Sequence, residues 1–110
     1  MTVKELTHAM DVYAFLLPEP GRQVTGGYAG DLLSWVMGRA EAGSAWLTNM
    51  SKHNVAAVAL MADAACVVLT EGVQPDPDLL RRAREKGVNL LGTALPTYAA
   101  ACALGRSLGL

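Results

Sequence analysis

Three short apolar runs in this chain each end in a threonine, and a polar turn and a helix pattern follow each of them. The runs are Ala45–Thr48, Cys66–Thr70 and Val88–Thr93. Short apolar strands that alternate with helices are typical of a parallel sheet covered on both faces. Because the carboxyl ends of parallel strands meet at one edge, the three threonine hydroxyls are expected to line up there. We therefore predict a single α/β domain over residues 1–110, with a central, mostly parallel sheet flanked by helices.

The size and composition of the chain limit the classes of protein to which it can belong. Its 110 residues suffice for one domain with one modest core. Hydrophobic residues make up 52% of the chain, and 11 glycines come in addition, whereas apolar residues with glycine included usually reach about 45–50%. A small monomer has difficulty burying so large a fraction, which favours a homodimer. The net charge of −1 gives no electrostatic argument for binding nucleic acid or membrane lipid.

The cysteines and the hydropathy pattern indicate a cytoplasmic protein. Cys66 and Cys102 lie in apolar surroundings without metal-ligand spacing, so we expect two buried core residues in a reducing compartment. The first residues lack the apolar stretch of a signal peptide. The longest apolar run, 55–70, is interrupted by Asp63 and is shorter than the roughly 20 residues of a membrane span. We predict no membrane segment, no metal and no cofactor.

Capping residues and turn residues set the other elements. Asp31 and Asn54 stand where N-cap residues of two helices belong, and Gly87 is a typical helix stop. Gly26 and Gly27 interrupt a weak strand, which predicts a bulge or the close approach of another backbone. The predicted helices cover residues 3–10, 32–40, 54–62, 77–86 and 97–108, and two further strands cover 12–17 and 23–29.

Two of these helices lack a polar face. The 54–62 segment is apolar on every side, and the 97–108 segment consists mostly of alanine. A helix that is apolar all round is buried all round, whereas a sheet covers only one side of a helix. We therefore expect both segments to contact another helix or a second subunit, and they are the leading candidates for a dimer interface.

Polar residues that could contact a ligand follow the strands that end in threonine. Mixed donors with one carboxylate suit a polar, hydroxyl-bearing molecule better than a bare phosphate. Structural roles remain open for several of them: His53 as a loop or capping residue, Ser51 and Asn54 as helix caps, and Glu71 as a carboxylate bonded to nearby backbone amides. The candidate ligand-binding residues are Thr48, Asn49, Ser51, His53, Asn54, Thr70, Glu71, Gly72, Thr93, Thr97 and Tyr98.

No catalytic set can be recognised. The chain has no nucleophile with an identifiable base, no Ser/His/Asp or Cys/His arrangement, and no phosphate-binding glycine motif around Gly26 and Gly27. The basic cluster from Arg81 to Lys86 has the pattern of a solvated helix face. We predict that the chain has no catalytic residues.

Short motifs in the second half of the chain connect it to a known family. Leu69-Thr70-Glu71-Gly72 resembles a Leu-Thr-Gly-Gly signature with Glu in place of one Gly, and Pro96-Thr97-Tyr98 resembles an Asp-Thr-aromatic helix start with Pro in place of Asp. With these motifs the chain resembles the DRTGG domain family from Trp46 onward. The upstream run Gly30–Gly38 is similar to small stand-alone members. The family's Asp-Arg pair is missing, and Ser51-Lys52-His53-Asn54 occupies that region.

The resemblance implies both a fold and a role. The family is similar in fold to the N-terminal domain of HPr kinase/phosphorylase, and inside phosphotransacetylases and CBS-domain pyrophosphatases it looks like a regulatory or dimer-forming module. Stand-alone members are associated with hydrogenase and redox-signalling genes. The expected function is a non-catalytic regulatory or assembly module, a homodimer that could also bind a protein partner. The alternative is a sensor of a nucleotide or polar metabolite, and an enzyme comes third.

Overall fold

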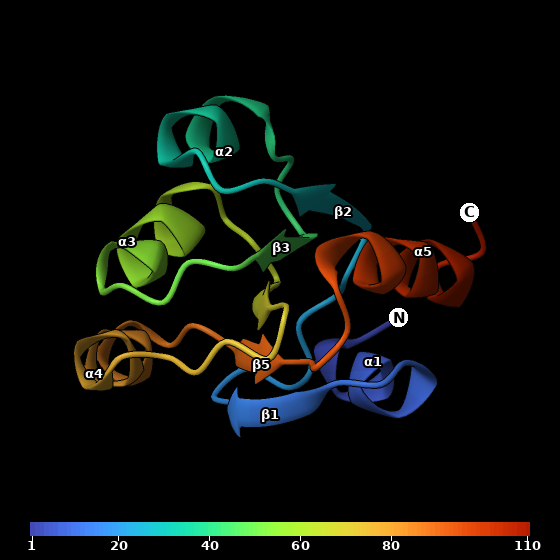
Figure 1. Cartoon of the computed structure of the whole chain (residues 1–110), viewed down its shortest axis with the longest axis horizontal. Helices are drawn as coiled ribbons and strands as arrows, with labels where there is room; N and C mark the ends of the chain where they lie inside the picture. Colours follow the sequence, from blue (N-terminus) through green and yellow to red (C-terminus); the bar gives the residue numbers. More distant parts are fainter.

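The computed structural model describes residues 1–110 as one α/β domain with a five-stranded sheet and five helices (Figure 1). The predicted order of elements is confirmed, and most boundaries differ from it by a few residues at most. In chain order the elements are α1 (Val3–Ala9), β1 (Tyr13–Leu16), β2 (Gly26–Ala29), α2 (Leu33–Arg39), β3 (Ser44–Thr48), α3 (Asn54–Met61), β4 (Cys66–Leu69), α4 (Pro77–Lys86), β5 (Leu90–Gly92) and α5 (Thr97–Ser107).

The sheet is parallel except for one edge strand. Its strand order is β1-β5-β4-β3-β2, and β2, β3, β4 and β5 pair in parallel. The first strand, β1, pairs with β5 in the antiparallel direction. The prediction that the three threonine-ended strands are parallel and central is therefore confirmed.

Helices cover both faces of the sheet. Figure 1 shows α2, α3 and α4 stacked on one side of the strands and α1 and α5 on the other. The helices of the first group each connect two consecutive parallel strands, as a parallel sheet requires. Both ends of the chain lie on the side of α1 and α5 (Figure 1).

Side chains along each central strand alternate between two cores. Trp46 and Val67 belong to the core under α2, α3 and α4, whereas Leu47 and Val68 belong to the core under α1 and α5. All of these side chains are buried, so the strands are apolar on both faces without a polar alternation. The indole Nε1 of Trp46 donates to the backbone oxygen of Gly30 at 2.9 Å, which satisfies its only polar group.

Two of the predicted helix caps are wrong. The N-cap of α2 is Leu32, whose side chain cannot make a capping bond. The Asp31 carboxylate instead accepts hydrogen bonds from Thr48 and Asn49, where β3 ends. Asn54 is the first residue of α3 and His53 precedes it, again without a capping bond from a side chain. Asp31 and Asn54 are residue types that commonly cap helices. In this structure neither side chain accepts a hydrogen bond from the first turn of its helix.

The expectations for glycines 26 and 27 and for the apolar helices also need correction. β2 pairs with β3 in unbroken register, so it has no bulge, and the neighbour that approaches Gly27 is the Leu104 side chain rather than another backbone.

Helix α3 packs between α2 and α4 but is not buried all round, because Leu60 is 51% exposed and Met61 is 67% exposed. Helix α5 is only partly buried.

Glycine 92 fits under two aromatic rings. It lies opposite Tyr13 in the β1–β5 pair, and the rings of Tyr13 and Phe15 meet edge to face with centroids 5.2 Å apart. A Cβ atom at residue 92 would lie 2.5 Å from Cε2 of Phe15 and 2.9 Å from Cε2 of Tyr13. These rings therefore cover the backbone of β5 at the position where a side chain is absent.

We predict that Gly92→Ala lowers the free energy of unfolding by about 1–3 kcal/mol, because two packed rings must move to make room. Gly26→Ala is the matched control, since a Cβ at this strand glycine meets nothing within 4 Å. Urea unfolding followed by tryptophan fluorescence measures both. Equal stabilities of the two variants would contradict the packing described here.

Candidate functional site: the carboxyl edge of the sheet

The three strand-ending threonines lie side by side, as the sequence predicts. The backbone amide of Thr70 donates to the carbonyl of Thr48 at 2.9 Å, and the amide of Thr93 donates to the carbonyl of Leu69 at 2.9 Å. The three residues are buried. They form one row across the carboxyl ends of β3, β4 and β5.

The hydroxyl of Thr48 binds a carboxylate from the neighbouring strand connection. Oγ1 of Thr48 donates to Oδ1 of Asp31 at 2.7 Å, and the amide of Asn49 donates to the same oxygen at 3.0 Å. Thr48 Oγ1 also accepts from the amide of Met50 at 3.3 Å. Asp31 therefore closes the turn after β3. It does not form the helix cap that its position in the sequence predicts.

The hydroxyls of Thr70 and Thr93 tie the strand ends to other segments. Oγ1 of Thr70 and Oγ1 of Thr97 share a hydrogen bond of 2.6 Å, which joins β4 to the first turn of α5. Oγ1 of Thr93 donates to the backbone oxygen of Asp11 at 2.6 Å and accepts from the amide of Leu95 at 3.1 Å. Every hydroxyl of the row thus has a partner within the chain.

Glu71 links the end of β4 to the start of α5. Its Oε2 accepts from the amide of Thr97 at 2.8 Å, one of the helix amides that lack a partner within the helix. The backbone of Glu71 has φ = 63°, in the left-handed region that favours glycine, and Gly72 follows with φ = 72°. The carboxylate is thus bonded to a nearby backbone amide, the structural role that the sequence left open.

A second group of candidate residues keeps its side chains available. Asn49, His53, Asn54 and Tyr98 are exposed, Tyr98 by 82%, and no side chain of this group makes a hydrogen bond. Ser51, which is half-buried, likewise makes no side-chain hydrogen bond, although its backbone oxygen accepts from the amide of Asp76 at 3.0 Å. These side chains, rather than the threonines, are the ones a ligand at this edge could reach without breaking an internal bond.

The loop between β3 and α3 is bonded to the residue that precedes α4. Nζ of Lys52 lies 3.3 Å from Oδ2 of Asp76, which precedes α4. With the bond from the amide of Asp76 to the Ser51 oxygen, this pair holds the loop against the start of α4. The polar side chains of the loop are therefore displayed from a fixed backbone.

The three cavities of the structure lie away from this edge. Two of them run along β2, and the third, of about 30 Å³, lies near Arg22 and Asn89. No three His, Cys, Asp or Glu side chains come together in a group that could hold a metal ion. The assignment of the eleven edge residues to a ligand stays a prediction.

The two cysteines differ in environment. Cys66 on β4 is buried, and burial raises the pKa of its thiol to about 12. A thiol held neutral in this way is unreactive, in keeping with a core role. Cys102 on α5 is only half-buried, so the expectation of two buried core cysteines is wrong for this one.

Comparisons with known proteins agree with the fold. The family model of the DRTGG domain matches residues 31–107. No curated protein matches the chain. Among solved structures the chain is similar to the CBS and DRTGG domains of the regulatory region of a Clostridium perfringens pyrophosphatase, solved with its activator diadenosine tetraphosphate. The TM-score is 0.74 at 13% identity, and the match covers 97% of this chain and 47% of that one, so the chain spans about half the length of this relative.

We predict that Glu71→Ala lowers the free energy of unfolding more than Glu71→Gly does. Both variants lose the carboxylate that bonds to the first turn of α5, which costs about 1 kcal/mol of stability. Glycine adopts the left-handed conformation of residue 71 without strain, whereas alanine does not, so the glycine variant should be more stable than the alanine variant by about 1 kcal/mol. Urea unfolding of the two variants and the wild type gives the order. If alanine were as stable as glycine at this position, the left-handed conformation of residue 71 would be contradicted.

Proposed function

The chain belongs to the DRTGG domain family, and we propose that it is a non-catalytic regulatory module that acts as a homodimer on a partner protein. The regulatory role is supported by the similarity of its fold to the regulatory region of a pyrophosphatase. The association of stand-alone family members with hydrogenase and redox-signalling genes indicates where such a partner can be sought.

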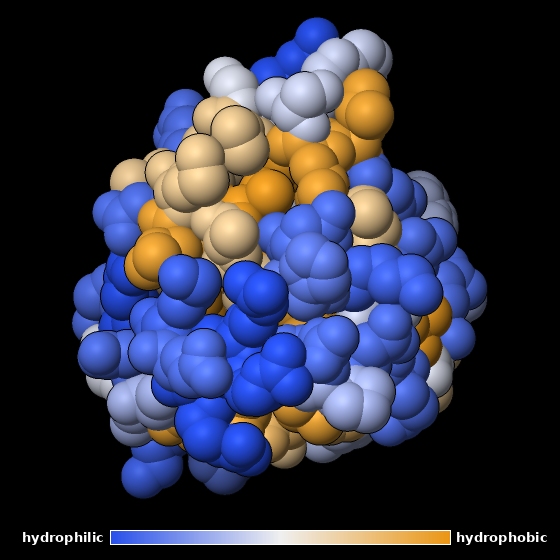
Figure 2. Space-filling model, turned by 90° about the vertical axis from the view of Figure 1, so that its left-hand side faces the viewer, coloured by the Kyte–Doolittle hydropathy of each residue, from blue (hydrophilic) through white to orange (hydrophobic).

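The observation that carries this proposal is the amount of apolar surface left exposed. In Figure 2 apolar atoms gather over α2 and α3, in the upper half of the face, while the lower half over α4 is mostly hydrophilic. Apolar surface of this kind on a small domain is typical of a protein interaction site. We call it the α2–α3 surface and assign it to the partner protein. Its large exposed apolar side chains are Trp35, Met37, Leu60 and Met61.

The state of the polar groups supports a role without catalysis. The buried hydroxyls of Thr48, Thr70 and Thr93 are bonded to an internal carboxylate, to another hydroxyl and to a backbone oxygen. None has a histidine as its partner, and the carboxylate oxygen of Asp31 that accepts from Thr48 also accepts from the amide of Asn49, which ties Asp31 to the turn. The hydroxyls thus stabilise the strand ends.

A second candidate function, a sensor of a nucleotide or polar metabolite, rests on the available side chains at the carboxyl edge. Asn49, His53 and Tyr98 supply amide, imidazole and phenol groups that lack internal partners. The similar pyrophosphatase region was solved with a nucleotide activator. Such a ligand would bind across the loop after β3 and the start of α5.

The homodimer is expected to appear in light scattering coupled to size exclusion. At tens of micromolar protein we predict a mass twice that of the 11.6 kDa chain. The physical reason is the apolar groove beside α5, lined by Ala101, Leu104 and Leu108, which a monomer leaves in contact with water. A mass of one chain over the whole concentration range would contradict a dimeric module.

The sensor function predicts thermal stabilisation by a nucleotide. A panel that includes diadenosine tetraphosphate and ATP should contain a compound that, at a hundred times its Kd, adds about 2.7 kcal/mol to the stability. Asn49→Ala should weaken this effect, and Ser34→Ala, which changes an exposed polar side chain outside the predicted site, should leave it unchanged. The absence of any shift with the wild type would exclude the nucleotides of the panel as ligands.

A further inference from the structure

One edge of the sheet is open. Strand β2 pairs with β3 on one side and has no strand on the other. From Thr25 to Gly30 the chain has neither a charged residue nor a proline. Natural proteins usually protect such an edge with charges, prolines or bulges, because its free backbone groups pair with any strand that reaches them.

The opposite edge is protected by these devices. Strand β1 has a register shift between Ala14 and Leu16, which interrupts its pairing. Pro18 and Pro20 lie just beyond its end, after Leu17, and cannot donate a backbone hydrogen bond that would extend the strand. The molecule therefore blocks pairing at β1 and leaves it open at β2.

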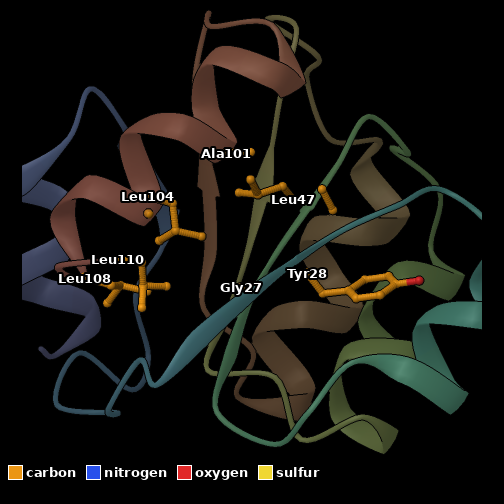
Figure 3. A pocket seen from close by; sticks show the side chains of 9 residues that line it. Gly27, Tyr28, Leu47, Ala101, Leu104, Leu108 and Leu110 are labelled. Carbon is orange, nitrogen blue, oxygen red and sulfur yellow. The ribbon is translucent and has the colours of Figure 1, made fainter.

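An apolar groove accompanies the open edge. Figure 3 shows α5 lying beside β2, with Leu104 and Leu108 directed toward the strand near Gly27 and Tyr28 directed the other way. The groove has a volume of about 180 Å³, and Ala101 and Gly105 of α5 also line it. Glycine 27 leaves space for Leu104, because a Cβ there would lie 2.5 Å from its Cδ2 atom.

A second cavity of about 330 Å³ borders the same strand. It shares Gly27, Tyr28 and Leu110 with the apolar groove. The two largest cavities of the chain thus both lie along β2.

We propose that the β2 edge and its groove bind a second copy of this chain, with β2 pairing antiparallel to β2 of the copy about a two-fold axis. The inference rests on the proposed homodimer and names its interface. Because α5 packs over β2 and β3, such an axis perpendicular to the sheet brings the two α5 helices together on one face. The result is a continuous ten-stranded sheet with apolar contact between helices above the junction.

Three properties of the surface favour a second copy over another partner. Ala101 and Gly105 are four residues apart, so they lie on one side of α5, and their small size lets two helices approach closely. The strand itself has no charge, and the two charged residues of the cavity beside it, Arg39 and Glu41, are of opposite sign, so the edge carries no excess charge that a copy would repel. A four-residue strand pair is marginal alone, so the apolar side of α5 is needed to stabilise it.

The test compares one alanine on each edge strand. Ala29 on β2 and Ala14 on β1 are both exposed, so lysine at either position leaves the core of the monomer intact. Ala29→Lys buries an unpaired charge in the proposed junction and should raise the dimer dissociation constant at least about 30-fold. Ala14→Lys should leave it unchanged. Light scattering and sedimentation over a concentration series measure both.

A third variant separates the failure of this inference from the failure of the proposed function. Met61→Lys places a charge on the α2–α3 surface and should leave the dimer intact. A dimer that dissociates in Met61→Lys but not in Ala29→Lys would overturn the β2 interface and keep the homodimer. A monomeric wild type would overturn both.

Hydrogen exchange of the wild type supplies a measurement that does not depend on a folded variant. Those amides of β2 (Gly26–Ala29) that point away from β3 should exchange more slowly at concentrations where the dimer forms than in dilute monomer. Protection confined to α3 on dimer formation would contradict pairing at β2.

Discussion

The structure depends on the burial of three parallel strands from both sides. The central strands β3, β4 and β5 carry apolar side chains on each face. One core lies under α2, α3 and α4 and the other under α1 and α5, so the loss of either group of helices would expose a core to water. A threonine follows the apolar residues of each strand, and its hydroxyl bonds to a nearby group where the backbone leaves the core. The polar residues at the carboxyl edge thus serve first of all to satisfy the backbone and hydroxyl groups at the strand ends.

The sequence predicts those elements that are determined by residues close to one another in the chain. The three threonine-ended strands and helix α4, with Pro77 at its start and Gly87 in the left-handed conformation at its end, follow from apolar runs and turn residues. The role of Asp31 could not be predicted in the same way, and for Glu71 the sequence left a ligand contact and a bond to a nearby backbone amide as alternatives. Their partners lie on Thr48 and Thr97, which are distant in the sequence, so local preference assigns Asp31 to a cap that it does not form.

Apolar composition also has limits as a guide to burial. Helix α3 is apolar throughout, and the sequence cannot separate Val55 in the core from Met61 at the surface. The difference arises because α2, α4 and the sheet cover three sides of the helix and leave its last turn exposed. The same reasoning explains Cys102, since α5 lies at the edge of the sheet, where its outer half has no neighbour.

Helix α5 contacts two of the surfaces to which we assign a role, the carboxyl edge and the groove beside β2. Its first turn is held at the carboxyl edge by Glu71 and Thr70, and its later residues Leu104 and Gly105 line the groove beside β2. Coupling between two sites requires an element whose position both sites influence. A ligand held by Asn49, His53 and Tyr98 would contact the first turn of α5, whose later residues line the groove at the other end of the helix. The polar edge and the proposed dimer interface are therefore joined by one helix, the arrangement through which a small regulatory domain could convert ligand binding into a change of assembly.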